Sequence, residues 1–188
     1  MTHDYEPGAV WPVVDDNEVQ IREVYSRFGL AMYMAQVMEH GIVNALLVLS
    51  LLPSMKGMAD RTSWDEAFDR FYDAELAKTL GNMIRTLEKT GAMPPDLIER
   101  LRVAKGYRDH LAHRFFREHD LDFMTKQGRT RMIVECEDRV DLFQSLDREV
   151  EAIVSVQRER YGITPEWVAE HVAMMECEAR SAEGRVKA

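Results

Sequence analysis

The residues most able to do chemistry lie together in one short segment, Arg108-Asp109-His110-Leu111-Ala112-His113. If this segment is helical, Asp109 lies one turn before His113 and Arg117 lies one turn after it. A carboxylate in that position can orient the imidazole and favour its protonated form, whereas the arginine works against protonation. A histidine that moves protons beside arginines that bind anions is typical of acid–base catalysis on an anionic substrate. The alternative is a solvated histidine on a polar helix face.

Two charged residues fall on helix faces that the sequence predicts to be apolar. Glu39 projects onto the centre of the apolar row of the first expected helix, between Ala35 and Ile42. Arg108 lies within about 20° of the middle of the apolar face of the expected helix over residues 96–118. An unpaired charge on a core face is costly, so we expect Glu39 and Arg108 to meet as a buried pair, with a structural or a functional role. Gly106 could bend the helix and move Arg108 away.

Other kinds of site have weaker support. His110 and His113 are three residues apart and could chelate a metal, but Glu118 lies five residues beyond His113 and points elsewhere, so no metal or other cofactor is predicted. The two cysteines, Cys136 and Cys177, fit neither a disulfide framework nor a Cys-x-x-Cys metal site. A glycine-rich phosphate loop and a Gly-x-Ser-x-Gly elbow are both missing from the sequence.

The charge of the chain is uneven. The 188 residues carry a formal net charge of −9, which argues against a broad nucleic-acid-binding surface. The window from Glu99 to His119, in contrast, carries about +3, and it contains three of the six histidines. We therefore expect any contact with an anionic partner to be confined to this window.

The elements that must position these residues are predicted to be helices, about five of them, in an antiparallel all-α bundle without a sheet. Residues 1–16 are expected to form an extended arm, residues 17–161 the helical domain, residues 162–181 a C-terminal amphipathic helix and residues 182–188 a flexible tail. The expected start and stop signals are Asn17 and Thr62 or Ser63 as N-caps, Gly91 before Pro94-Pro95, Thr125 as N-cap, Gly162 as a stop and Thr164-Pro165-Glu166 as the last start.

The sequence also predicts the compartment. The N-terminus has neither the basic nor the apolar region of a signal peptide. The most apolar stretch, from Ile42 to Leu52, is too short to span a bilayer and is interpreted as a buried helix end. We expect a soluble, cytoplasmic protein without a membrane partner.

The segment Arg108 to Phe116 resembles the Arg-polar-x-x-x-His signature of the HEPN superfamily, whose members are small all-helical domains. The segments Lys78 to Gly81 and Thr125 to Phe143 are also similar to stand-alone bacterial abortive-infection proteins of this superfamily. The resemblance covers about residues 20–160 and leaves the final helix unexplained.

The resemblance implies a metal-independent endoribonuclease of a toxin or phage-defence kind. Arg108 and His113 would be the catalytic pair and Asp109 the polar residue that holds them, with Glu39, His110, Arg114 and Arg117 in support. The 2′-hydroxyl of single-stranded RNA would attack its own 3′-phosphate, His113 would move protons, and Arg108 or Arg117 would stabilise the phosphate.

The resemblance also implies a homodimer with the two motifs across a shared cleft. That arrangement would place an arginine of one subunit beside the histidine of the other, because His113 lies about 140° from Arg108 around a helix. A nucleotidyltransferase antitoxin, if there is one, would be a separate chain. The alternative function is a non-catalytic helical module that binds a nucleotide or a partner protein.

Overall fold

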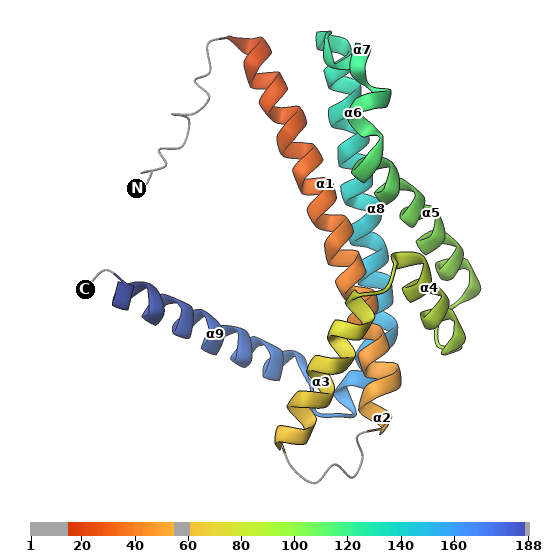
Figure 1. Cartoon of the computed structure of the whole chain (residues 1–188), viewed down its shortest axis with the longest axis vertical. Helices are drawn as coiled ribbons and strands as arrows, with labels where there is room; N and C mark the ends of the chain where they lie inside the picture. Colours follow the sequence, from red (N-terminus) through yellow and green to blue (C-terminus); the bar gives the residue numbers. More distant parts are fainter. Residues whose placement is uncertain (1–14, 55–60, 187–188) are drawn as a thin grey trace.

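The protein is all-helical over the residues that the computed structural model describes, 15–54 and 61–186. Two long helices, α1 (Asp16–Leu46) and α8 (Lys126–Glu159), lie side by side and form the most extensive helix pair (Figure 1). The all-α prediction is therefore confirmed for the described residues. The expected arm falls largely on residues 1–14, outside the described ranges.

The shorter helices pack around this pair in chain order. After α1 come the π-helical segment η1 (Leu47–Leu51), α2 (Leu52–Ser54), α3 (Arg61–Leu76), α4 (Leu80–Lys89), α5 (Pro95–His113), α6 (Phe115–Glu118) and α7 (Asp120–Phe123). The buried core comes mainly from α1, η1, α4, α5 and α8, and α6 adds Phe115. Phe143, Met38 and Ile42 are also among its largest fully buried side chains.

Caps and stops explain where several helices begin and end. Asp15, one of the residues expected in the arm, caps α1, because its side chain accepts from the backbone N–H groups of Asn17 and Glu18 at 2.9 Å. Asn17 was predicted as this cap, and that prediction is wrong. Thr125 caps α8 as predicted, since its hydroxyl accepts from the N–H of Gly128 at 3.0 Å. Gly91 and Gly162 follow helices with positive φ angles, 68° and 80°, which favour glycine.

The helix expected over residues 96–118 is interrupted at Arg114, whose backbone (φ −134°, ψ −18°) leaves the helical region. The break turns the chain so that Phe115 is buried and stacks on Phe28 of α1, with ring centroids 5.4 Å apart. Phe116 packs on the same ring at 4.9 Å. Burial of Phe115 and the contact of both rings with Phe28 offset the interruption of the helix.

The C-terminal helix α9 (Pro165–Val186) continues beyond its expected end at residue 181, and its residues up to 182, whose burial the structure describes, add nothing to the buried core. It projects away from the other helices (Figure 1). By length and composition, the continuous helical stretch Asp16–Ser54 could cross a membrane, contrary to the short apolar run predicted. Half of its most apolar window is buried inside the protein, as in the core helix of a soluble domain.

Candidate functional site

The arginine of the motif is paired as predicted. Nε of Arg108, on α5, donates to Oε1 of Glu39, on α1, at 2.7 Å. The pair is only partly buried, because 31% of the Arg108 side chain and 16% of the Glu39 side chain stay exposed. The burial expected for the pair is therefore only partial: Arg108 reaches across the edge of the α1–α5 contact with its tip near solvent.

Asp109 was predicted to orient His113, but its carboxylate contacts Arg108 and Lys105 instead. Its Oδ1 accepts from Nη1 of Arg108 at 3.2 Å, and its Oδ2 accepts from Nζ of Lys105 at 2.5 Å. Partial burial alone would raise the pKa of Asp109, but the hydrogen bond and charge of Lys105, followed by those of Arg108, lower it overall. The prediction that Asp109 orients His113 is wrong, because the lysine one turn earlier on α5 competes successfully for the carboxylate.

Lys105 is positioned by the neighbouring helix α4. Gly81 faces the aliphatic stem of Lys105, and a Cβ at this glycine would lie 3.2 Å from its Cε. Gly81 belongs to the segment Lys78 to Gly81, in which Thr79 caps α4. This segment therefore supports the α5 motif through packing.

His113 is the last residue of α5, and its side chain is exposed. Within the described residues it makes no hydrogen bond or ion pair, and the same is true of Arg117 on α6. The predicted one-turn spacing from His113 to Arg117 does not hold, because the helix breaks at Arg114 between them. Arg114 makes one long contact, from Nε to Oε1 of Glu118 at 3.7 Å. This end of α5 thus presents an unpaired imidazole and two exposed guanidinium groups.

The positive window of the sequence is mostly neutralised in three dimensions. Arg100 pairs with Glu149 of α8, Arg102 pairs with Glu88 of α4 at 2.6 Å, and Lys105 and Arg108 are paired as described. The acids that neutralise Arg100 and Arg102 lie outside or at the edge of the window in sequence, so a local count could not include them. Of the arginines and lysines in this window, Arg114 has one long ion-pair contact and Arg117 has none within the described residues.

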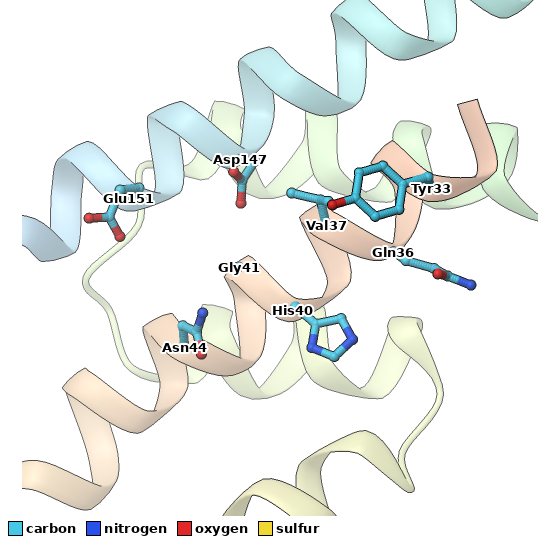
Figure 2. Close-up of a pocket in the computed structure, with 8 residues that line it drawn as sticks. All are labelled: Tyr33, Gln36, Val37, His40, Gly41, Asn44, Asp147 and Glu151. Atoms are coloured by element: carbon cyan, nitrogen blue, oxygen red, sulfur yellow. The ribbon is translucent and has the colours of Figure 1, made fainter. Parts of the chain in front are cut away.

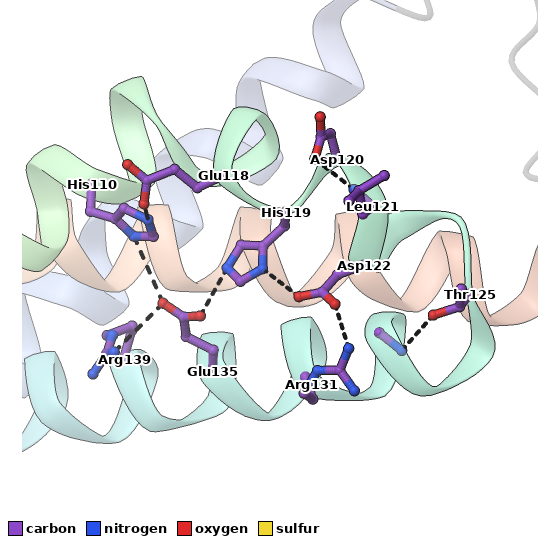
Figure 3. A network of polar contacts seen from close by, with 11 residues as sticks. His110, Glu118, His119, Asp120, Leu121, Asp122, Thr125, Arg131, Glu135 and Arg139 are labelled. Atoms are coloured by element: carbon purple, nitrogen blue, oxygen red, sulfur yellow. Dashed lines mark hydrogen bonds and ion pairs between the residues drawn. The ribbon is translucent and has the colours of Figure 1, made fainter.

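His110 points into a polar network between α5 and α8 (Figure 3). Its Nε2 lies 3.0 Å from Oε2 of Glu118, and its Nδ1 lies 3.7 Å from Oε1 of Glu135. His119, between α6 and α7, bridges Asp122 and Glu135 at 3.0 Å from each. His119 and Glu135 were missed in the sequence, because the corner that brings them to His110 depends on the break at Arg114.

A cavity of about 450 Å³ lies between α1 and α8, away from the motif in sequence, and it was not predicted from the sequence (Figure 2). His40 lies on its α1 wall and contacts the hydroxyl of Tyr72 at 2.7 Å, while Asp147 and Glu151 lie on its α8 wall. Burial, and then repulsion from Glu151, raise the pKa of Asp147. Its carboxylate faces Gly41, where a Cβ would lie 2.0 Å from Oδ1.

The cysteines offer no nucleophile near the motif. Cys136 is buried, and burial raises the pKa of its thiol to about 12, so the reactive thiolate is suppressed. Cys177 is exposed on α9.

Comparison with known proteins identifies no relative: the chain matches no protein-family model, no curated protein and no solved structure.

Proposed function

We propose that the protein is a metal-independent endoribonuclease of the HEPN kind that cleaves single-stranded RNA. The observation that carries the proposal is the exposed, unpaired imidazole of His113, followed by the exposed guanidinium groups of Arg114 and Arg117. A histidine with free ring nitrogens can exchange protons with a bound substrate, and the neighbouring arginines supply cations for a phosphate.

In the proposed reaction, the 2′-hydroxyl oxygen of the RNA attacks the adjacent 3′-phosphorus and the P–O5′ bond breaks. The products are a 2′,3′-cyclic phosphate and a 5′-hydroxyl, which receives the proton that the 2′-hydroxyl loses. His113 moves the proton, and Arg117 stabilises the charge that develops on the phosphate oxygens. Arg108 already donates Nε to Glu39 and one Nη1 hydrogen to Asp109 in its own subunit, so the donors left for a substrate are Nη2 and the second hydrogen of Nη1. Asp109 acts here as a positioning residue for Arg108 rather than for His113.

A homodimer forms part of the proposal, because Arg108 and His113 lie on different sides of α5. Exposed apolar side chains in the segment that follows the motif support such a contact: Leu121 on α7 is 72% exposed, and Met124, the residue after α7, is 74% exposed. Side chains of this kind at the surface of a monomer favour association. An isologous contact through this face would set the two copies of His113 near one groove.

The proposed setting is the cytoplasm, where such an enzyme would act in phage defence or as a toxin, with an antitoxin on a separate chain. Because the acidic remainder of the protein repels RNA, binding should depend on the few exposed arginines and should weaken with salt.

The test is cleavage of a labelled single-stranded RNA by the purified protein in EDTA, with DNA of the same sequence as the negative substrate. His113→Ala should lower the cleavage rate by about 10²-fold or more. His171→Ala, a histidine on α9, is the matched control and should cleave like wild type. No cleavage by wild type, or equal cleavage by His113→Ala, would contradict the proposal.

A second function, a non-catalytic binding module, is favoured by one observation. Two of the three residues of the proposed catalytic set, Arg108 and Asp109, make intramolecular contacts that hold α5 to α1 and to its own preceding turn. If the RNA assay is negative while labelled RNA or a nucleotide still binds, this second function is the better account.

A further inference from the structure

The network between α5, α7 and α8 contains a set of side chains with the composition of a metal site. His110, His119 and Glu135 each offer a ligand atom, and these atoms all lie within 4.8 Å of one another. Ligands of a tetrahedral zinc ion, at about 2.0–2.2 Å from the metal, are separated from each other by roughly 3.3 Å. The separation between Nε2 of His119 and Oε2 of Glu135, 3.0 Å, is close to that value, and Nδ1 of His110 lies 3.7 Å from the same carboxylate group.

The other nitrogen of each imidazole provides a second, independent observation. Nε2 of His110 contacts Glu118 at 3.0 Å, and Nδ1 of His119 contacts Asp122 at 3.0 Å. Histidines that bind metals almost always have their second ring nitrogen held by a carboxylate or carbonyl, which fixes the tautomer and the ring orientation. Both histidines here have this support, while their remaining nitrogens face Glu135 (Figure 3).

The surrounding residues hold these carboxylates in place. Arg131 pairs with Asp122, and Arg139 contacts Oε1 of Glu135 at 3.6 Å while its guanidinium lies 3.6 Å above the ring of Tyr107. Asp122 is further constrained by α8, since its backbone packs directly against Gly128. The three ligand side chains are only 16–24% exposed, so their positions are restricted before any ion arrives.

We infer that His110, His119 and Glu135 bind one divalent transition-metal ion of the zinc class, with Glu118 and Asp122 as supporting carboxylates. Two imidazoles select such an ion over Mg²⁺ or Ca²⁺, which prefer oxygen ligands. Three protein ligands leave a fourth position open. A surface groove of about 470 Å³, lined by His110, Glu135, Tyr107 and Arg114, lies beside it and gives water or an anion access.

The proposed metal site and the proposed ribonuclease centre use different residues, and metal binding should affect stability rather than RNA cleavage. His113 is not a ligand, and the ion would join the end of α5, the α6–α7 corner and α8, which are held otherwise by hydrogen bonds and packing. Metal binding should therefore stabilise the fold, while EDTA should leave His113-dependent RNA cleavage intact. The two proposals can fail separately.

The test is titration of the metal-stripped protein with ZnCl₂ by calorimetry, with metal analysis after gel filtration and thermal unfolding with and without zinc. Wild type should bind one zinc per chain and unfold at a higher temperature with zinc present. Co²⁺ in place of Zn²⁺ should give the visible absorption of a tetrahedral or five-coordinate site.

The variants His119→Ala and Glu135→Gln should lower the affinity by well over tenfold, and Asp122→Asn by about 10–100-fold. His113→Ala and His171→Ala, which leave the cluster intact, should bind zinc like wild type. Circular dichroism in the absence of metal checks that each variant is folded. If wild type binds no stoichiometric zinc, or if Glu135→Gln binds it as well as wild type, the cluster is a hydrogen-bonded network alone and the inference is overturned.

Discussion

The guanidinium of Arg108 divides its hydrogen bonds between Glu39, on another helix, and Asp109, its neighbour in sequence. Since the pair with Glu39 is only partly buried, its energy should lie between that of a surface ion pair and that of a buried one. A double-mutant cycle with Glu39→Gln and Arg108→Met should therefore give a coupling energy of about 1 kcal/mol. The measurement is urea unfolding of the four proteins. A coupling energy near zero would show that the ion pair with Asp109 stabilises Arg108 and that Glu39 contributes nothing.

The raised pKa of Asp147 predicts that the free energy of unfolding depends on pH. Because burial raises the pKa of this carboxyl in the folded state, the folded protein binds the proton more tightly than the unfolded chain does. The free energy of unfolding should therefore fall as pH rises from about 4, the ordinary value for aspartate, through the raised folded value. Asp147→Asn should raise the melting temperature at pH 7 by up to about 3 °C.

The gain from Asp147→Asn should disappear at about pH 3, where aspartate is largely protonated in both the folded and the unfolded state. Asp141→Asn, at an exposed position of the same helix, is the control and should have little effect at either pH. Thermal unfolding followed by circular dichroism at the two pH values makes the comparison. An equal gain at both would contradict an electrostatic origin.

At the scale of the helices, two glycines in the described bundle should respond to alanine in opposite directions. A Cβ at Gly128, in the first turns of α8, would lie 2.1 Å from the backbone oxygen of Asp122 and 2.4 Å from its Cα. Gly106, within α5, has nothing within 4 Å of the position that a Cβ would occupy. Gly128→Ala should destabilise the protein by about 1–3 kcal/mol through overpacking.

Gly106→Ala should stabilise the protein by about 0.5–1 kcal/mol through helix propensity. Chemical denaturation of both variants beside wild type measures the two effects. If Gly128→Ala unfolds at the same denaturant concentration as wild type, the close contact between α8 and the α7 segment is not maintained in solution.

At the scale of the whole molecule, the exposed apolar side chains of Leu121 and Met124, in the segment that follows the motif, predict self-association. Sedimentation equilibrium at tens of micromolar should detect a homodimer, and Leu121→Glu should shift it towards monomer by placing a charge in the contact. Val156→Glu is the control, since Val156 is 60% exposed near the far end of α8.

Leu121→Glu should also lower RNA cleavage if the partner subunit's Arg108 completes the site. A wild-type protein that stays monomeric at these concentrations would contradict the dimer. A dimer that survives Leu121→Glu would place the contact on another face.

The sequence by itself determined the helices and one long-range contact. Helical periodicity, together with local signals such as Thr125, Gly91 and Gly162, was sufficient to predict most of the elements, because these signals act within a turn or two of the chain. The pairing of Glu39 with Arg108 was also predictable, since two opposite charges on apolar helix faces strongly favour each other.

Only the tertiary structure determined which residues the polar side chains of the motif contact. Phe115 is buried immediately after the break in the helix at Arg114, and that break separates Arg117 from His113. The same corner brought His119 to Glu135, sixteen residues away in sequence. Asp109 turned to Lys105 rather than to His113, although both lie one helical turn away. Periodicity predicts which face a residue occupies, but the packing of aromatic rings and competition among charges determine which contacts form there.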